Sequence, residues 1–219
     1  SGAPVSAEAF VQCAPFLDAS MVSPLLELLG RLETMAARRV LIEVLAVLGR
    51  RNLSAVSRGL RDKRWYVVRN TLHILGKIND PRSVETLGHC VSHQDPRVRK
   101  EAFRALGQIR SPKILPYLKT GLADPDEAVR ILAVKAFRTL AGSDVARRLL
   151  LEEINGKGFS GKSFPEKKEF FQVLALWDTD DVLGFLQKTL TRRALIARSR
   201  ADELRACAAS AVSLVKDPE

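Results

Sequence analysis

Aromatic residues and cysteines are scarce in this 219-residue chain, and their scarcity argues against several classes of protein. Phe, Trp and Tyr make up 6% of the residues, whereas enclosed cofactor pockets and β-sandwiches usually use more. The 3 cysteines lack the spacing of a disulfide framework or a zinc site. We therefore expect buried free thiols in a reducing, cytoplasmic compartment.

Long apolar runs are missing as well, so no membrane-spanning helix is expected. Apolar residues still make up 46% of the chain, which is enough for a core and excludes general disorder. The chain begins at Ser1 without a methionine and ends at Glu219 within a charged segment. These ends predict a fragment of a larger, bacterial protein.

An internal repeat of about 31 residues predicts the architecture. Residues 67–78, VVRNTLHILGKI, and residues 98–109, VRKEAFRALGQI, share their apolar positions and a glycine. The same phrase returns at Val129 and at Leu204, and a partial copy covers residues 40–49. In each copy the apolar residues follow one face of a helix, and an Asp-, Ser- or Pro-containing breaker precedes a second, shorter helix. One such hairpin cannot bury its apolar stripe alone, so neighbouring hairpins must stack.

The phrase D-x-x-V-R-x-x-A-x-x-A-L-G-x-I, from Asp95 to Ile109, resembles a HEAT repeat of the short bacterial type known from phycobilin lyases. The resemblance implies an all-α solenoid in which first helices lie outside and second helices line a concave face. It also implies binding more often than catalysis.

We therefore predict a right-handed α-α superhelix, a HEAT-like solenoid of about six helix hairpins. One repeat array is expected over residues 1–219, with the clearest repeats at 61–142 and 199–219 and a loop insertion at 155–165.

Residues 156–163, GKGFSGKS, formally match a phosphate-binding loop. A genuine loop of this kind follows a buried strand, whereas residues 146–154 continue a helix in repeat register. We therefore predict a loop between repeats and no bound cofactor, and the sequence leaves any other role of this segment open.

The three histidines, His73, His89 and His93, do not predict a metal site. His89 and His93 lie four residues apart, but zinc needs three or four ligands and this pair supplies two. The His-Glu pairs of HEAT-type di-iron hydroxylases are also missing.

Two acid–base pairs, Asp95 with Arg99 and Asp126 with Arg130, recur at the same position of successive repeats. Chemistry needs one site rather than a row, so we expect Asp to cap a helix and Arg to reach a neighbouring repeat. Trp65 and Trp177 resemble the aromatic residues that stack on bases in HEAT-like alkylpurine DNA glycosylases, but both fit an apolar stripe and are predicted to be core. No catalytic residue is predicted, and the chain is expected not to be an enzyme.

Positive charge is concentrated in one part of the chain. The net charge is +10, yet residues 1–30 carry −3 and residues 31–69 carry +7. Many of these bases fall at junctions between hairpins, which stack along one edge of a solenoid. The predicted partner-binding residues are Arg38, Arg39, Arg61, Lys63, Arg64 and Arg97. These residues are expected to be free for a partner, whereas Arg99 is expected to be committed to contacts between repeats.

The predicted function is a non-catalytic interaction or scaffold module that binds an acidic protein through this basic edge or the concave face. Weak, nonspecific nucleic-acid binding is one alternative, and a bilin-lyase-like or DNA-glycosylase-like enzyme is another. No membrane and no small-molecule substrate are inferred.

Overall fold

The computed structural model describes residues 7–192 and 198–213. In these ranges the chain forms thirteen α-helices joined by short 3-10 turns, and no strand occurs there. The all-α fold class predicted from the repeat is therefore confirmed. The chain divides into two compact units, Ser1–Tyr117 and Leu118–Glu219. The single array over residues 1–219 stays a prediction.

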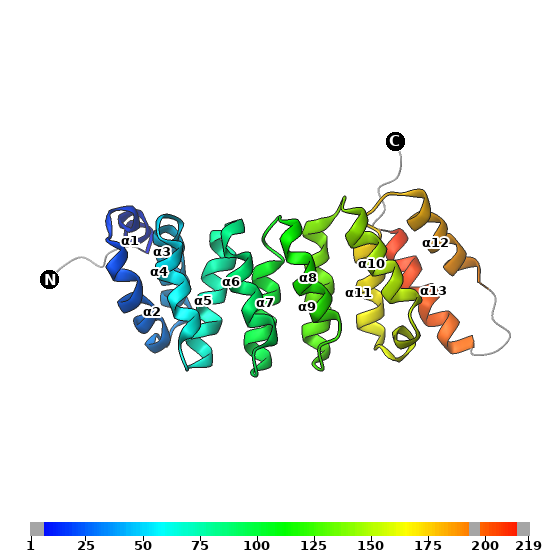
Figure 1. The fold of residues 1–219 in the computed structure, drawn as a ribbon, viewed down its shortest axis with the longest axis horizontal. Coiled ribbons are helices and arrows are strands. Elements are labelled where there is room, and N and C mark those ends of the chain that lie inside the picture. The colour runs from blue at the N-terminus through cyan, green and yellow to red at the C-terminus, as the bar shows by residue number, and fades with distance from the viewer. Residues whose placement is uncertain (1–6, 193–197, 214–219) are drawn as a thin grey trace. The chain divides into compact units, whose positions relative to one another are not determined.

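From α3 to α6 the N-terminal unit consists of helix hairpins whose first helix is long and whose second helix is short (Figure 1). The first helices of successive hairpins, α3, α5 and α7, pack against one another in that order. The helices of this unit are α1 (Ala7–Cys13), α2 (Val22–Arg31), α3 (Met35–Arg51), α4 (Leu53–Ser57), α5 (Trp65–Ile78), α6 (Val84–Gly88) and α7 (Pro96–Leu106).

In the C-terminal unit α9 likewise packs on α11 and α11 on α13, but the second helices α10 and α12 are slightly longer than α9 and α11. The boundary between the units falls inside α8 (Leu115–Leu122). The remaining helices are α9 (Glu127–Ala136), α10 (Asp144–Asn155), α11 (Phe164–Leu174), α12 (Asp180–Thr191) and α13 (Arg198–Val212). None of the described helices is both long and apolar enough to cross a membrane.

The helices begin where the sequence places capping residues. The Asp95 carboxylate accepts from the Arg97 N–H at the start of α7, where Pro96 occupies the first turn. The Ser163 hydroxyl caps α11 in the same way by accepting from the Glu166 N–H. These caps satisfy N–H groups that have no partner within the helix.

Small residues allow successive first helices to approach closely, as the repeat predicts. Ala102 and Ala105 of α7 are buried. Gly76 of α5 lies so close to α7 that a Cβ atom there would be 2.9 Å from the Ala105 Cα. Because ordinary Cβ contacts are longer, the glycine of the repeat phrase marks a place where two helix backbones meet.

The segment between α10 and α11 is packed against the unit. It contains a short 3-10 helix, Lys157–Gly161, and follows α10 directly. The Phe159 side chain is buried and meets Phe170 edge-on, with ring centroids 5.3 Å apart. The Lys162 ammonium donates to Glu166 at 2.7 Å. The residues before the segment are thus helical, as the sequence predicts.

Two predictions about buried residues need correction. Cys90 and Cys207 are buried as expected, and burial raises the pKa of each thiol to about 11, but Cys13 is exposed. Trp177 is buried and donates its indole N–H to the Ser143 carbonyl at 3.2 Å, so its assignment to the core is confirmed. Trp65 is only half-buried, because it lies at the solvent-facing start of α5.

Candidate protein-interaction groove

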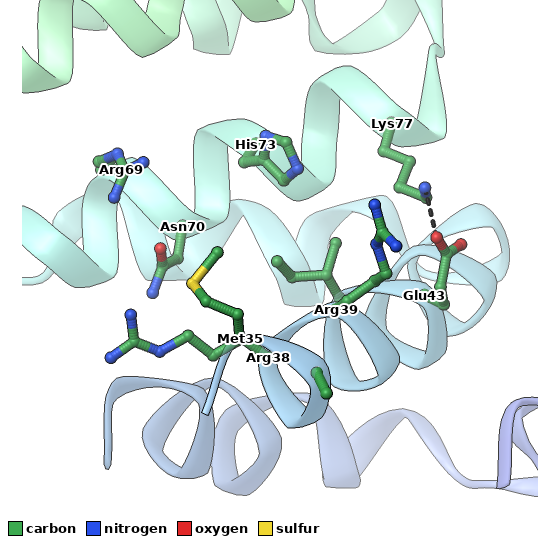
Figure 2. A pocket seen from close by; sticks show the side chains of 10 residues that line it. Met35, Arg38, Arg39, Glu43, Arg69, Asn70, His73 and Lys77 are labelled. Atoms are coloured by element: carbon green, nitrogen blue, oxygen red, sulfur yellow. Dashed lines mark ion pairs between the residues drawn. The ribbon is translucent and has the colours of Figure 1, made fainter. Parts of the chain in front are cut away.

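A groove of about 760 Å³ lies between α3 and α5 of the N-terminal unit (Figure 2). On α5 the residues Arg69, His73 and Lys77 are spaced by four, which places them on one face of the helix. The start of α3 supplies the opposite wall. The lining residues are Met35, Ala36, Arg38, Arg39, Ile42, Glu43, Arg69, Asn70, His73 and Lys77.

The groove is rich in basic groups, and its one lining carboxylate is already paired. Lys77 Nζ lies 2.5 Å from Glu43 Oε1 at one end of the groove. Arg38 Nε donates to the Leu32 carbonyl at 2.7 Å. Arg39 is exposed, and its side chain forms no hydrogen bond or ion pair with any residue that the structure describes. An incoming anion would therefore find unneutralised positive charge.

Behind the groove, a buried carboxylate of α7 holds the bases of α5 in place. Glu101 is almost fully buried and accepts from His73 Nδ1 at 2.9 Å and from Arg104 at 3.1 Å. Arg69 lies 3.9 Å from the same carboxylate. Burial acts to raise the pKa of Glu101, but the hydrogen bonds and charges of His73 and Arg104 outweigh it, so the pKa lies below its ordinary value.

Arg64, predicted to be free for a partner, is instead bound within the chain. Its guanidinium lies 2.7 Å from Asp62 and 2.8 Å from Glu27 of α2. The hydrogen bond from Arg64 lowers the pKa of Asp62, and these two carboxylates raise the pKa of Arg64. Sequence reasoning missed the pairing because Glu27 lies 37 residues away.

Arg97 is also engaged, which corrects its predicted availability. Its guanidinium lies 2.7 Å from Asp95 and stacks over the Trp65 ring at 3.5 Å from the centroid. The Trp65 ring therefore forms a cation–π contact with Arg97 instead of packing in the core as the sequence predicted. The hydrogen bond from Arg97 lowers the pKa of Asp95 to about 2.

The six predicted partner-binding residues therefore do not form one site. Arg38 and Arg39 line the α3–α5 groove, whereas Arg61 lines another groove on the second-helix layer. Lys63 is exposed and lines neither groove. Whether any of them binds a partner stays a prediction.

Sequence reasoning also missed the α5 side of the groove. Arg69, His73 and Lys77 recur every four residues, a signal already present in the sequence. They lie within a helix, away from the junctions between hairpins where the predicted basic edge lies.

The acid–base pairs of successive repeats serve the structure, as predicted. Asp126 caps α9 through the Val129 N–H, and Arg130 donates to the Asp124 carbonyl at 2.8 Å. Arg130 also donates two hydrogen bonds, of 2.9 and 2.8 Å, to the buried Glu166 carboxylate of α11. In the N-terminal unit, Arg99 likewise donates to a backbone carbonyl of the preceding turn, that of His93.

The histidines have ordinary structural surroundings. His89 is exposed, and His93 accepts the Asp95 N–H through Nδ1 at 2.9 Å. Among the residues that the structure describes, no three His, Cys, Asp or Glu side chains come together in a set that could hold a metal ion.

The family of the repeats follows from this geometry and from a sequence comparison. Residues 54–138 and 86–154 match the family model of HEAT repeats. The chain carries HEAT repeats at residues 54–154.

Curated relatives match a shorter stretch. The chain is 37% identical over 75 residues to a deoxyhypusine hydroxylase of Rattus norvegicus and 36% identical over 78 residues to that of Eremothecium gossypii. The matches cover 33% and 35% of this chain, and 25% and 24% of the relatives. The chain therefore matches about a quarter of the length of these relatives.

These relatives overturn one prediction of the sequence analysis. The chain was expected not to be an enzyme, yet the curated proteins that it resembles are named as enzymes. The described residues nevertheless do not fit an iron centre of the di-iron hydroxylase kind, which needs several clustered histidines and carboxylates. Among the described residues, the one His–Glu pair within hydrogen-bond distance is His73 with Glu101, and the Glu101 carboxylate also accepts from Arg104.

Among solved structures, computationally designed armadillo repeat proteins for modular peptide recognition share the fold. The likeness covers 96% of this chain and 100% of that chain, with a TM-score of 0.50 and 16% sequence identity. At this identity the likeness shows the fold alone, an array of helical repeats.

Proposed function

We propose that this chain is a protein-binding module that takes an acidic segment of a partner protein into the α3–α5 groove. HEAT-like repeats present long surfaces built from successive helices, and such surfaces bind extended partners. The observation that carries the proposal is that Arg38, Arg39 and Arg69 line one groove, whose one lining carboxylate, Glu43, is already neutralised by Lys77. Arg69 also faces Glu101 behind the groove, whereas Arg39 has no such partner.

The groove has features that suit a polypeptide segment. Arginine forks bind carboxylates through paired hydrogen bonds, and Asn70 offers both a donor and an acceptor to a peptide backbone. Met35 is 77% exposed at the groove, and its flexible thioether can pack against varied apolar side chains. The mixture of apolar and basic groups favours an acidic peptide over a bare polyanion.

The test is charge reversal within the groove. Arg39→Glu with Arg69→Glu should weaken binding of a Glu- and Leu-containing peptide about tenfold or more, measured by fluorescence anisotropy. The matched control is Arg110→Glu with Lys113→Glu, two exposed positions that line neither groove. Equal losses in both variants, with the helical circular dichroism retained, would show that only net charge matters.

The curated relatives support a second candidate, action on a deoxyhypusine-containing protein. In that case the groove would hold the substrate protein, and the chemistry could use residues beyond this quarter of the relatives' length. Incubation with a deoxyhypusine peptide, dioxygen and a two-electron reductant, followed by mass spectrometry, tests for the gain of one oxygen atom, the second oxygen atom leaving as water. That gain would support this candidate, and an unchanged peptide mass would count against it.

A further inference from the structure

A second groove lies on the other helix layer of the N-terminal unit, between the short helices of two successive hairpins. It has a volume of about 1130 Å³ and is formed by the end of α3, by α4, by α6 and by the turns that follow α4 and α6. Its lining contains no Asp or Glu. Its basic side chains are Arg51, Arg58, Arg61, Arg82, His89 and His93.

Two of these arginines are anchored within the chain. Arg51 donates to the Pro15 carbonyl at 2.6 Å, and Arg82 lies 2.6 Å from Asp80. Both guanidiniums therefore have a fixed direction, and the remaining N–H groups stay available for a ligand.

The other two arginines carry unneutralised charge. Arg58 and Arg61 are exposed, and their side chains form no hydrogen bond or ion pair within the described part of the chain. A smaller neighbouring pocket is lined by Glu27 and Asp62, but both carboxylates form ion pairs with Arg64. An anion in the groove would therefore meet little competition from acidic side chains.

The polar groups and shape of the groove narrow the class of ligand. Thr86 adds a hydroxyl group, whereas the Ser54 and Ser57 hydroxyls already donate to Asn52 and to the Leu53 carbonyl. No Phe, Tyr or Trp side chain lines the groove, so stacking of nucleic-acid bases is not favoured. The groove is also larger and more polar than is usual for an enclosed small-molecule site.

We propose that this groove binds a phosphorylated segment of a partner protein. A phosphate monoester carries up to two negative charges and three acceptor oxygens, so it can accept from several arginine donors at once. The fixed cations of the groove are all arginines, whose planar forks bind phosphate oxygens in pairs. No residue lines both grooves, so this inference does not depend on the proposed function.

The probe is a fluorescein-labelled Gly-Ser peptide that carries two phosphoserines, compared with its serine and glutamate forms at physiological salt. We expect the phosphorylated form to bind at least about tenfold more tightly than either. Arg58→Gln with Arg61→Gln should remove most of that preference. The matched control, Arg110→Gln with Lys113→Gln, should change the affinity less than about twofold.

Three results would overturn the proposal. The first is equal affinity for all three peptides. The second is an equal loss of affinity for the phosphorylated peptide in the control variant, which would indicate that only the net charge of the chain attracts it. The third is that a short duplex DNA binds more tightly than the phosphorylated peptide and that the Arg58 and Arg61 variant abolishes this binding, which would assign the groove to nucleic acid. Loss of helical circular dichroism in the variant is not expected, because both side chains are exposed.

Discussion

Gly76 and Gly184 show how the same residue type has different roles at different contacts. A Cβ at Gly76 would lie 2.9 Å from the Ala105 Cα, whereas a Cβ at Gly184 of α12 would have no atom within 4 Å. The first glycine is required by helix packing, and the second costs helix stability without a steric reason.

Replacement by alanine should therefore have opposite effects at these two positions. Gly76→Ala should destabilise the protein by about 1–3 kcal/mol, because α5 must move away from α7. Gly184→Ala should stabilise it by about 0.5–1 kcal/mol through helix propensity. Urea unfolding followed by circular dichroism measures the change in the free energy of unfolding for each variant. If both variants changed it in the same direction, the packing argument would be contradicted.

The buried carboxylate of Glu166 makes the stability of the folded protein depend on pH. It is fully buried and bound by Arg130 and Lys162. Burial acts to raise its pKa, but the hydrogen bonds and charges of these two bases outweigh it and lower the pKa from its ordinary value of 4.5. A carboxylate whose pKa is lower in the folded state contributes stability above pH 4.5, and that stability is lost as the pH falls through the folded pKa.

Glu166→Gln should therefore destabilise the protein by about 3 kcal/mol at pH 7, because Arg130 and Lys162 lose their partner. The difference from wild type should shrink as the pH falls below 4.5, because Glu166 takes up a proton first in the unfolded chain and, at lower pH, in the folded chain as well. Urea midpoints between pH 7 and 3 test this. Glu152→Gln, an exposed change in the same unit, should leave the pH profile unchanged.

At the scale of elements, the segment 156–163 depends on one aromatic anchor. Phe159 is 4% exposed and packs against Phe170, whereas Phe164, at the start of α11, is 42% exposed. The glycines on either side make the backbone flexible, so the segment is ordered by this side chain and by the Lys162–Glu166 contact.

Phe159→Ala should cost about 3 kcal/mol and release the segment, so that trypsin cleaves faster after Lys157 and Lys162. Phe164→Ala should cost less than about 1 kcal/mol and leave the cleavage rate unchanged. Gel analysis of timed digests gives the rates. If both variants were cleaved alike, Phe159 would not be the anchor.

At the scale of the whole molecule, the net charge of +10 predicts attraction to any polyanion. Much of the basic edge is nevertheless neutralised, since Arg64 binds Glu27 and Asp62 and Arg97 binds Asp95. Nonspecific attraction is therefore weaker than the count of bases suggests.

Duplex DNA should accordingly bind with a Kd of about 1–100 µM at physiological salt, and the affinity should fall steeply as salt rises. The acidic peptide of the α3–α5 groove should depend less on salt, because part of its binding comes from apolar contact with Met35. Anisotropy titrations over a salt series measure both slopes. Equal slopes would favour the nucleic-acid alternative over the acidic partner.

The sequence by itself determined the helical repeats, their caps and their small contact residues. These features are local: the 3.6-residue period places Ala102 and Ala105 on the buried face, and Asp95 followed by Pro96 starts a helix. The link from Arg130 to a neighbouring repeat was likewise predictable, because Arg99 and Arg205 stand at the same position of two other copies.

The tertiary structure alone decided which charges are free. Arg64 meets Glu27 from 37 residues away, and Arg97 stacks over Trp65, so both depend on the distance between stacked hairpins. The α3–α5 groove likewise combines Arg39 and Arg69 from two hairpins. The periodicity of one helix specifies which face is buried, but only the packing of two helices specifies which opposite charges come within a few ångströms.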